Sequence, residues 1–157
     1  MNRRRGSGFT LIELVVTLAI LALLAGMAAP LAETLVRRDK ERELKRALYE
    51  MRDAIDRYKL YADAGYIDKP AGSSGYPPNL TVLVEGVRDK RSARGEAFYF
   101  LRRIPRDPFA AELDVQRHWG LRASTSSAED PREGDDVFDV YSLARGVGLN
   151  GIAYREW

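Results

Sequence analysis

Hydrophobic residues are unevenly distributed along this chain. No charged side chain occurs between Glu13 and Glu33, and the 19 residues 14–32 are almost entirely apolar. As an α-helix this stretch would be about 28 Å long at ~1.5 Å per residue, enough to cross a ~30 Å hydrocarbon core. The pattern therefore predicts a single membrane-spanning helix over about residues 11–32, and no second stretch of this kind follows in the sequence.

After residue 32 the pattern becomes that of an amphipathic helix. Apolar residues recur every three or four positions and form a stripe on one face. We therefore expect one long helix over residues 9–64, in which Pro30 produces a kink or a local loosening. Two helices separated at Pro30 are the alternative. The apolar stripe consists of Leu44, Leu48, Met51, Ile55, Tyr58 and Ala62.

The opposite face of this helix is strongly charged. Mixed charges of this kind are usually solvated, and the alternative is a set of ion pairs between neighbouring copies. The face is expected to carry Arg37, Arg38, Lys40, Glu41, Lys45, Arg46, Glu50, Arg52, Asp53, Asp56, Arg57 and Lys59.

Residues 65–157 are expected to form a separate head. Gly65 is placed to end the long helix, and Asn79 is placed to cap a short helix at about 80–84 that stops at Gly86.

Strand-like segments come later in the head. Residues 118–123 and 137–143 have strand character, and the polar residues 124–136 between them are typical of a long hairpin loop. The fold class predicted is α+β, with a long N-terminal helix packed on a small C-terminal antiparallel sheet.

Composition excludes several classes of function. The 157 residues have a formal charge of +2, which becomes −1 without Arg3, Arg4 and Arg5, so the remainder is not a generic nucleic-acid binder. The chain has no cysteine and one histidine, His118, which excludes thiolate sites and paired-histidine metal sites. We expect His118 to be a strand residue with a backbone partner, and we expect no enzymatic activity, because no catalytic motif accompanies it.

The most informative motif lies just before the apolar helix. Residues 6–13 read Gly-Ser-Gly-Phe-Thr-Leu-Ile-Glu after three arginines. A carboxylate at the start of a membrane helix is costly, so Glu13 is either a functional residue or one that reaches to the headgroups. The whole segment resembles the N-terminal signal of type IV pilins and type II secretion pseudopilins, including the proline late in the helix.

This resemblance implies a processing site. A prepilin peptidase would cut between Gly8 and Phe9, release the basic leader of residues 1–8 and methylate the new Phe9 amine. Glu13 would then pair with the N-terminal amine of a neighbouring subunit as a filament assembles, which sets the register of assembly. An ordinary secretory signal fits less well, because the apolar run is long and no clean Ala-x-Ala site closes it. Gly26-Met27-Ala28 is a possible small-x-small site, but Pro30 follows it closely.

Three segments of the head resemble the major, G-type pseudopilin. They are Tyr76-Pro77 before the short helix, the run from Leu101 to Phe109 with its Ile-Pro and Asp-Pro pairs, and the strand-like residues 137–142. The resemblance implies a structural subunit of a periplasmic filament that drives export by a type II secretion system. The implied partners are other copies of the chain, other pseudopilins, the prepilin peptidase, and an inner-membrane platform with a cytoplasmic ATPase.

The same resemblance implies calcium in the C-terminal loop. However, residues 144–151 contain Arg145 and no carboxylate, and calcium prefers six to eight oxygen ligands. We therefore expect no cofactor, with calcium at this loop as the less favoured alternative, and expect Tyr154 and Trp157 to hold the tail by aromatic packing. A solvated loop is likewise favoured over a cation site for the acidic residues Glu129, Asp130, Glu133, Asp135 and Asp136.

The distribution of charge also predicts how the chain is oriented in the membrane. The arginines before the helix favour a cytoplasmic N-terminus, so the protein should cross the bacterial inner membrane once, with its head in the periplasm. The alternative function is a type IV pilin or minor pilin used in adhesion or DNA uptake, which would need an exposed basic patch with stacking aromatics. A membrane-tethered enzyme is the least favoured alternative.

Overall fold

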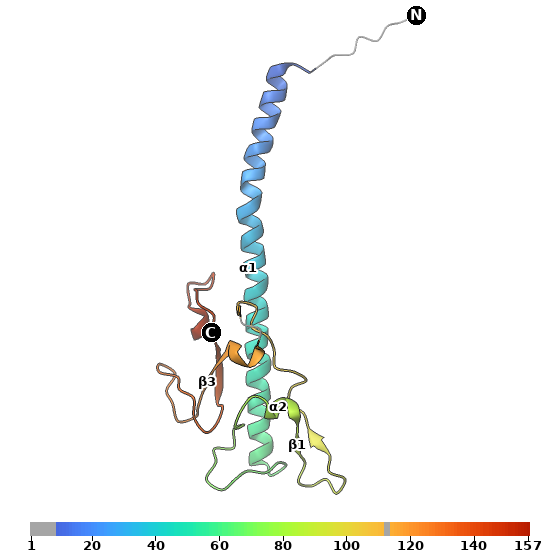
Figure 1. Cartoon of the computed structure of the whole chain (residues 1–157), viewed down its shortest axis with the longest axis vertical. Helices are drawn as coiled ribbons and strands as arrows, with labels where there is room; N and C mark the ends of the chain where they lie inside the picture. The colour runs from blue at the N-terminus through green and yellow to red at the C-terminus, as the bar shows by residue number, and fades with distance from the viewer. Residues whose placement is uncertain (1–8, 112–113) are drawn as a thin grey trace, which may run out of the picture. The chain divides into compact units, whose positions relative to one another are not determined.

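The computed structural model describes residues 9–111 and 114–157, although the side chains of residues 27–30 and 116 are not described. Helix α1 runs from Leu11 to Asp63 and is followed by short elements (Figure 1). The chain forms two compact units, one ending at Asp39 and the other comprising Lys40–Trp157. The second unit therefore contains the C-terminal part of α1 together with all later elements.

The apolar stripe of α1 forms the centre of the second unit. Leu44, Met51 and Ile55 are fully buried, and Leu48, Tyr58 and Ala62 are nearly so. They pack against residues from later in the chain, among them Leu83, Phe100 and Val140. Burial of one helical face explains why the charged residues between the stripe positions remain exposed or at its border.

Two small elements follow the end of α1. Helix α2, Val82–Glu85, begins after Asn79, whose side-chain oxygen accepts a hydrogen bond from the Val82 amide at 3.0 Å, and ends at Gly86, which has φ of 90°. Strands β1, Val87–Arg88, and β2, Ala97–Phe98, then pair in antiparallel fashion. A short helix is thus confirmed here, but it begins at Val82 and not at about residue 80, and its N-cap residue is Thr81 and not the predicted Asn79. Strand β1 was not predicted.

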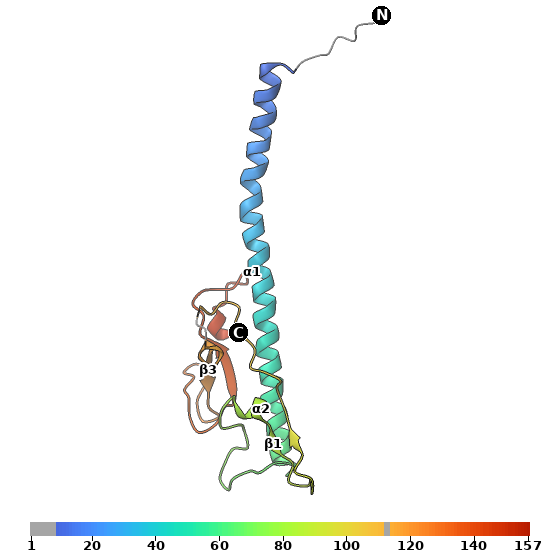
Figure 2. The ribbon, with the colours of Figure 1, turned by 45° about the vertical axis from the view of Figure 1, so that its right-hand side comes forward.

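The remaining strands form a second pair. Strand β3, Trp119–Arg122, is antiparallel to β4, Asp139–Ser142, with Trp119 opposite Ser142. Figures 1 and 2 show this pair alongside the C-terminal part of α1. The polar residues 124–136 connect the two strands, as the sequence predicts.

Two 3-10 turns complete the fold. They are η1, Val115–His118, and η2, Tyr154–Glu156. His118 lies at the end of η1, so its placement in a strand was wrong, but its expected backbone partner exists: its Nδ1 accepts a hydrogen bond from the Asp107 amide at 3.3 Å. The α+β class is confirmed, with the correction that the β structure consists of two separate two-stranded sheets.

Candidate processing and assembly site

The N-terminus of α1 is closed by a reciprocal pair of side chains. The Thr10 hydroxyl accepts a hydrogen bond from the Glu13 amide at 3.3 Å, and the Glu13 carboxylate accepts one from the Thr10 amide at 3.5 Å. This is a capping box, which satisfies two amides that the first helical turn leaves without partners. This capping box was not predicted, although its signal, Thr-x-x-Glu, can be read directly from residues 10–13.

Apolar side chains surround the first turns of α1 on every side. Leu11 is 83% exposed, and each of the leucine, isoleucine and valine side chains from there to Leu24 is at least half exposed. Among the described residues α1 is a helix long and apolar enough to cross a membrane. Such a surface is stable only against lipid or another protein.

The structure describes only some of the residues predicted to take part in processing and assembly. Gly8 and the leader of residues 1–8 lie outside the described residues, and Phe9 is the first residue described, largely exposed ahead of the helix. At position 30 the chain remains helical, so α1 is not divided into two helices there. Cleavage at Gly8–Phe9, a pairing role for Glu13 and a kink at Pro30 remain predictions.

The C-terminal segment, residues 143–157, is attached to α1 by Glu41. This carboxylate is only 8% exposed. Its Oε1 atom accepts hydrogen bonds from the Leu149 amide at 2.8 Å and from the Tyr154 hydroxyl at 3.0 Å. The prediction that Glu41 lies on the solvated face was therefore wrong; it continues the apolar stripe, three positions before Leu44.

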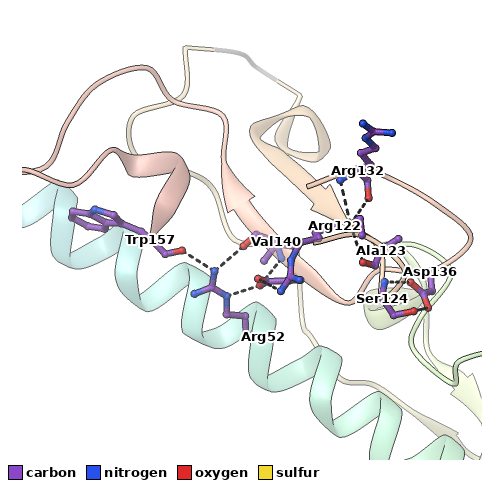
Figure 3. A network of polar contacts seen from close by, with 10 residues as sticks. Arg52, Arg122, Ala123, Ser124, Arg132, Asp136, Val140 and Trp157 are labelled. Atoms are coloured by element: carbon purple, nitrogen blue, oxygen red, sulfur yellow. Dashed lines mark hydrogen bonds and ion pairs between the residues drawn. The ribbon is translucent and has the colours of Figure 1, made fainter. Parts of the chain in front are cut away.

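Arg52 makes the second attachment of the C-terminal segment to α1. Its guanidinium donates to the main-chain oxygens of Trp157 at 2.7 Å and Val140 at 3.1 Å (Figure 3) and pairs with Asp139 at 2.7 Å. Tyr154 packs edge-on against Trp157 and stacks on Phe109. Aromatic packing of the tail is thus confirmed, but the two charged residues of α1 that assist it were not predicted.

Comparison with known proteins gives two matches. Residues 3–29 match the family model described as the prokaryotic N-terminal methylation motif. The chain carries a prepilin-type N-terminus. It is also 26% identical over 156 residues to the type II secretion system core protein G of Dickeya chrysanthemi, covering 94% of both chains. No solved structure matches.

These matches confirm the predicted resemblance to the type II secretion pseudopilins and, among them, to the G type. The similarity to core protein G covers 94% of the chain, so it extends beyond the N-terminal motif into the head. Together with the apolar part of α1, the methylation motif indicates a membrane-anchored chain.

The residues present do not fit the calcium that this resemblance implies. Residues 143–152 include only two polar side chains, Arg145 and Asn150, and the Asn150 oxygen already accepts a hydrogen bond from the Ile152 amide at 3.1 Å. A calcium ion requires several hard, mostly anionic oxygen atoms. Within the described part of the chain, no group of three or more His, Cys, Asp or Glu side chains is placed to hold a metal ion.

The acidic loop between β3 and β4 uses some of its charges for local structure. Asp136 accepts hydrogen bonds from the amide and hydroxyl of Ser124 at 2.8 and 2.6 Å (Figure 3). Burial acts to raise the pKa of Asp136, but hydrogen bonds from Ser124 and Ser74 outweigh it and lower the pKa. Asp130 pairs with Arg132. These contacts fix the loop conformation.

The core also brings together a serine, a histidine and an aspartate. Asp107, His118 and Ser142 are 0%, 1% and 0% exposed, respectively. The Ser142 hydroxyl donates to the Asp107 carboxylate, while the Asp107 amide donates to His118. Nucleophilic catalysis needs a serine directed at the histidine and open to substrate. This cluster instead joins β4 to the turn that contains the Asp-Pro pair.

Proposed function

We propose that this protein is a structural subunit of a periplasmic pseudopilus, the filament that drives protein export in a type II secretion system. The supporting observation is the combination of a prepilin-type N-terminus with a helix whose apolar side chains are exposed on all sides. In the membrane, lipid covers these side chains. Outside it, they can be buried only against the same helix of other copies, which drives polymerisation.

The proposed orientation follows the distribution of charge. Arg3, Arg4 and Arg5 favour a cytoplasmic N-terminus, which would place the head in the periplasm. The prepilin peptidase would then cut at Gly8–Phe9 on the cytoplasmic side, and an inner-membrane platform with its ATPase would drive assembly with other pseudopilins. The role needs no cofactor, because the subunit contributes surfaces and not chemistry.

The pilin alternative, in adhesion or DNA uptake, is less well supported. It requires aromatic rings that are open for stacking beside basic residues. The rings of Tyr66, Phe98 and Phe100 in the head pack edge-on against the Tyr61 ring of α1. The Arg91 guanidinium lies 3.5 Å from the centre of the Tyr66 ring. These rings serve the fold, and the similarity to core protein G favours secretion.

The processing step provides the direct test. Intact-mass spectrometry of membrane-extracted protein should give a chain that begins with N-methylated Phe9, and a peptidase-deficient strain should give the full-length chain. Replacing Gly8 with a bulky residue should block the cut, because the protease cleft accepts an extended chain with a small residue. A mature N-terminus near Ala29 would indicate ordinary secretory cleavage and would overturn the proposal.

A further inference from the structure

We propose that the C-terminal segment is held closed by the carboxylate of Glu41, which takes the structural place of a calcium ion and makes the head independent of calcium. The inference concerns the head alone and goes beyond filament formation. Three observations support it: the groups that the segment directs inward, the segment oxygen atoms that already accept hydrogen bonds, and the two points at which α1 binds the segment.

The first observation is the polarity of the segment. A calcium-binding loop directs oxygen atoms toward a central cation. Here the Leu149 amide and the Tyr154 hydroxyl both direct hydrogen atoms toward one buried oxygen of Glu41, at 2.8 and 3.0 Å. The segment is therefore arranged around an anion, and hydrogen bonds to a buried charged acceptor are among the stronger ones in proteins.

The second observation concerns the main-chain oxygens of the segment. The Gly146 oxygen accepts from the Tyr154 amide at 3.2 Å, and the Gly148 oxygen accepts from the Gly151 amide at 2.9 Å. The Ile152 oxygen accepts from the Gly148 amide at 2.8 Å and from the Trp157 indole at 3.2 Å. Hydrogen bonds within the segment thus already engage three of its carbonyl groups, which a cation site would have to recruit.

The third observation is that α1 fastens the segment at two points. Glu41 binds its middle, and Arg52 binds the main-chain oxygen of Trp157 at 2.7 Å, about 16 Å further along the helix at ~1.5 Å per residue. Lys45 lies between them with its ammonium group 4.6 Å from the centre of the Trp157 ring. The charges that order this segment therefore come from α1, and no added ion is required.

Limited proteolysis of the full-length chain in detergent is the test, with fragments identified by mass spectrometry and thermal unfolding followed in parallel. Each variant is measured in EGTA and in ~5 mM calcium chloride, which exceeds the roughly 10⁻⁴–10⁻³ M range of weak extracellular calcium sites. The variants are Glu41→Gln, which removes the charge but keeps the size, and Tyr154→Phe, which removes one donor. Glu50→Gln, an exposed glutamate on the same helix, is the matched control.

The wild-type segment and the Glu50→Gln segment should be equally protected in both solutions. Glu41→Gln should expose the segment to cleavage about tenfold faster and lower the melting temperature by about 5 °C or more, with no rescue by calcium. Tyr154→Phe should show a smaller change of the same kind. Protection of the wild type that depends on calcium, or a Glu41→Gln chain as resistant as wild type, would overturn the proposal. Neither readout requires a filament.

Discussion

The first turns of α1 and its last turns are both rich in apolar residues, yet these residues have opposite surroundings. Leu11 and Leu18 are 83% and 57% exposed, whereas Leu44 and Ile55 are fully buried. The difference lies in periodicity. Apolar residues surround the helix before residue 32, but from Leu44 onward most of them lie on one stripe, which the head covers, and isolated ones such as Leu60 remain exposed.

The comparison shows that one continuous helix serves two kinds of association. A stripe can be buried within a single chain, because the charged face remains available to water. A helix that is apolar on every side has no face to leave in water and must be enclosed by lipid or by other chains. Experiments on the two parts of the helix can test this division.

Removing residues 1–32 should separate the two behaviours completely. The remaining chain should leave the membrane fraction and still fold, because the stripe from Leu44 to Ala62 packs within the second unit. Membrane fractionation followed by size-exclusion chromatography and thermal unfolding measures this. Aggregation of the truncated protein would show that the stripe also contacts neighbouring copies.

Substitution of Glu13 tests whether the apolar part of α1 associates with other copies of the chain. Glu13→Ala should still insert in the membrane and still be cut, because it removes a costly charge from the membrane helix. Filament formation should be lost, because an unpaired Phe9 amine buried in the filament costs roughly 3–5 kcal/mol, or about two to four orders of magnitude per addition step. Filament yield by negative-stain microscopy after overexpression is the measurement.

The capping box supplies matched controls for this experiment. Thr10→Val removes the hydroxyl that caps the helix, at a cost of about 0.5–2 kcal/mol, but keeps the charge, so filaments should still form. Glu13→Gln can keep the cap but lacks the charge, so filaments should be lost. If Thr10→Val lost filaments while Glu13→Gln gave a normal filament yield, the role of Glu13 would be helix capping alone.

Truncation of a side chain in the buried stripe should lower the free energy of unfolding, whereas truncation on the exposed face should not. Met51→Ala should lower the free energy of unfolding by about 2–5 kcal/mol, because Met51 is fully buried. Leu60→Ala, at a largely exposed position of the same helix, should change it by less than about 0.5 kcal/mol. Urea unfolding of the full chain in detergent compares the two, and equal losses would contradict the assigned face.

The pH dependence of stability that comes from Tyr58 is expected to be a small effect. Burial raises the pKa of Tyr58 above its ordinary value of 10.0. The folded state therefore holds this proton more tightly than the unfolded state, and its contribution to stability is complete below pH 10 and is lost as the pH rises above it. Tyr58→Phe should consequently lose less stability than wild type between pH 9 and pH 11. Tyr49→Phe, at an exposed position, should follow the wild type.

Much of the fold could be predicted because its signals are local. The bounds of α1, the hydrogen bond from the Val82 amide to Asn79 at the start of α2, and the β3–β4 pair all follow from patterns within a few residues. The short β1 strand and the turn at η1 were missed, because segments of two to four residues carry too little periodicity to be distinguished from loops.

The position of charged residues on α1 was harder to predict. Glu41 and Arg52 belong to a helix with many exposed charges, and both were predicted to lie on its solvated face. Their spacing from Leu44 and Leu48 was the available signal, since it places both at the border of the apolar stripe. A charged residue at such a border is buried only if a partner meets it, and helical spacing does not reveal partners.

The membrane helix, the N-terminal motif with Glu13 and the resemblance to pseudopilins can be read from the amino-acid sequence, because each depends on residues close together in the chain. The closure of the head depends on contacts that form only in the folded chain. Glu41 meets Leu149 across 108 positions of sequence, and Arg52 meets Trp157 across 105. A carboxylate can be buried only where folding brings donors to it, and here those donors come from the far end of the chain.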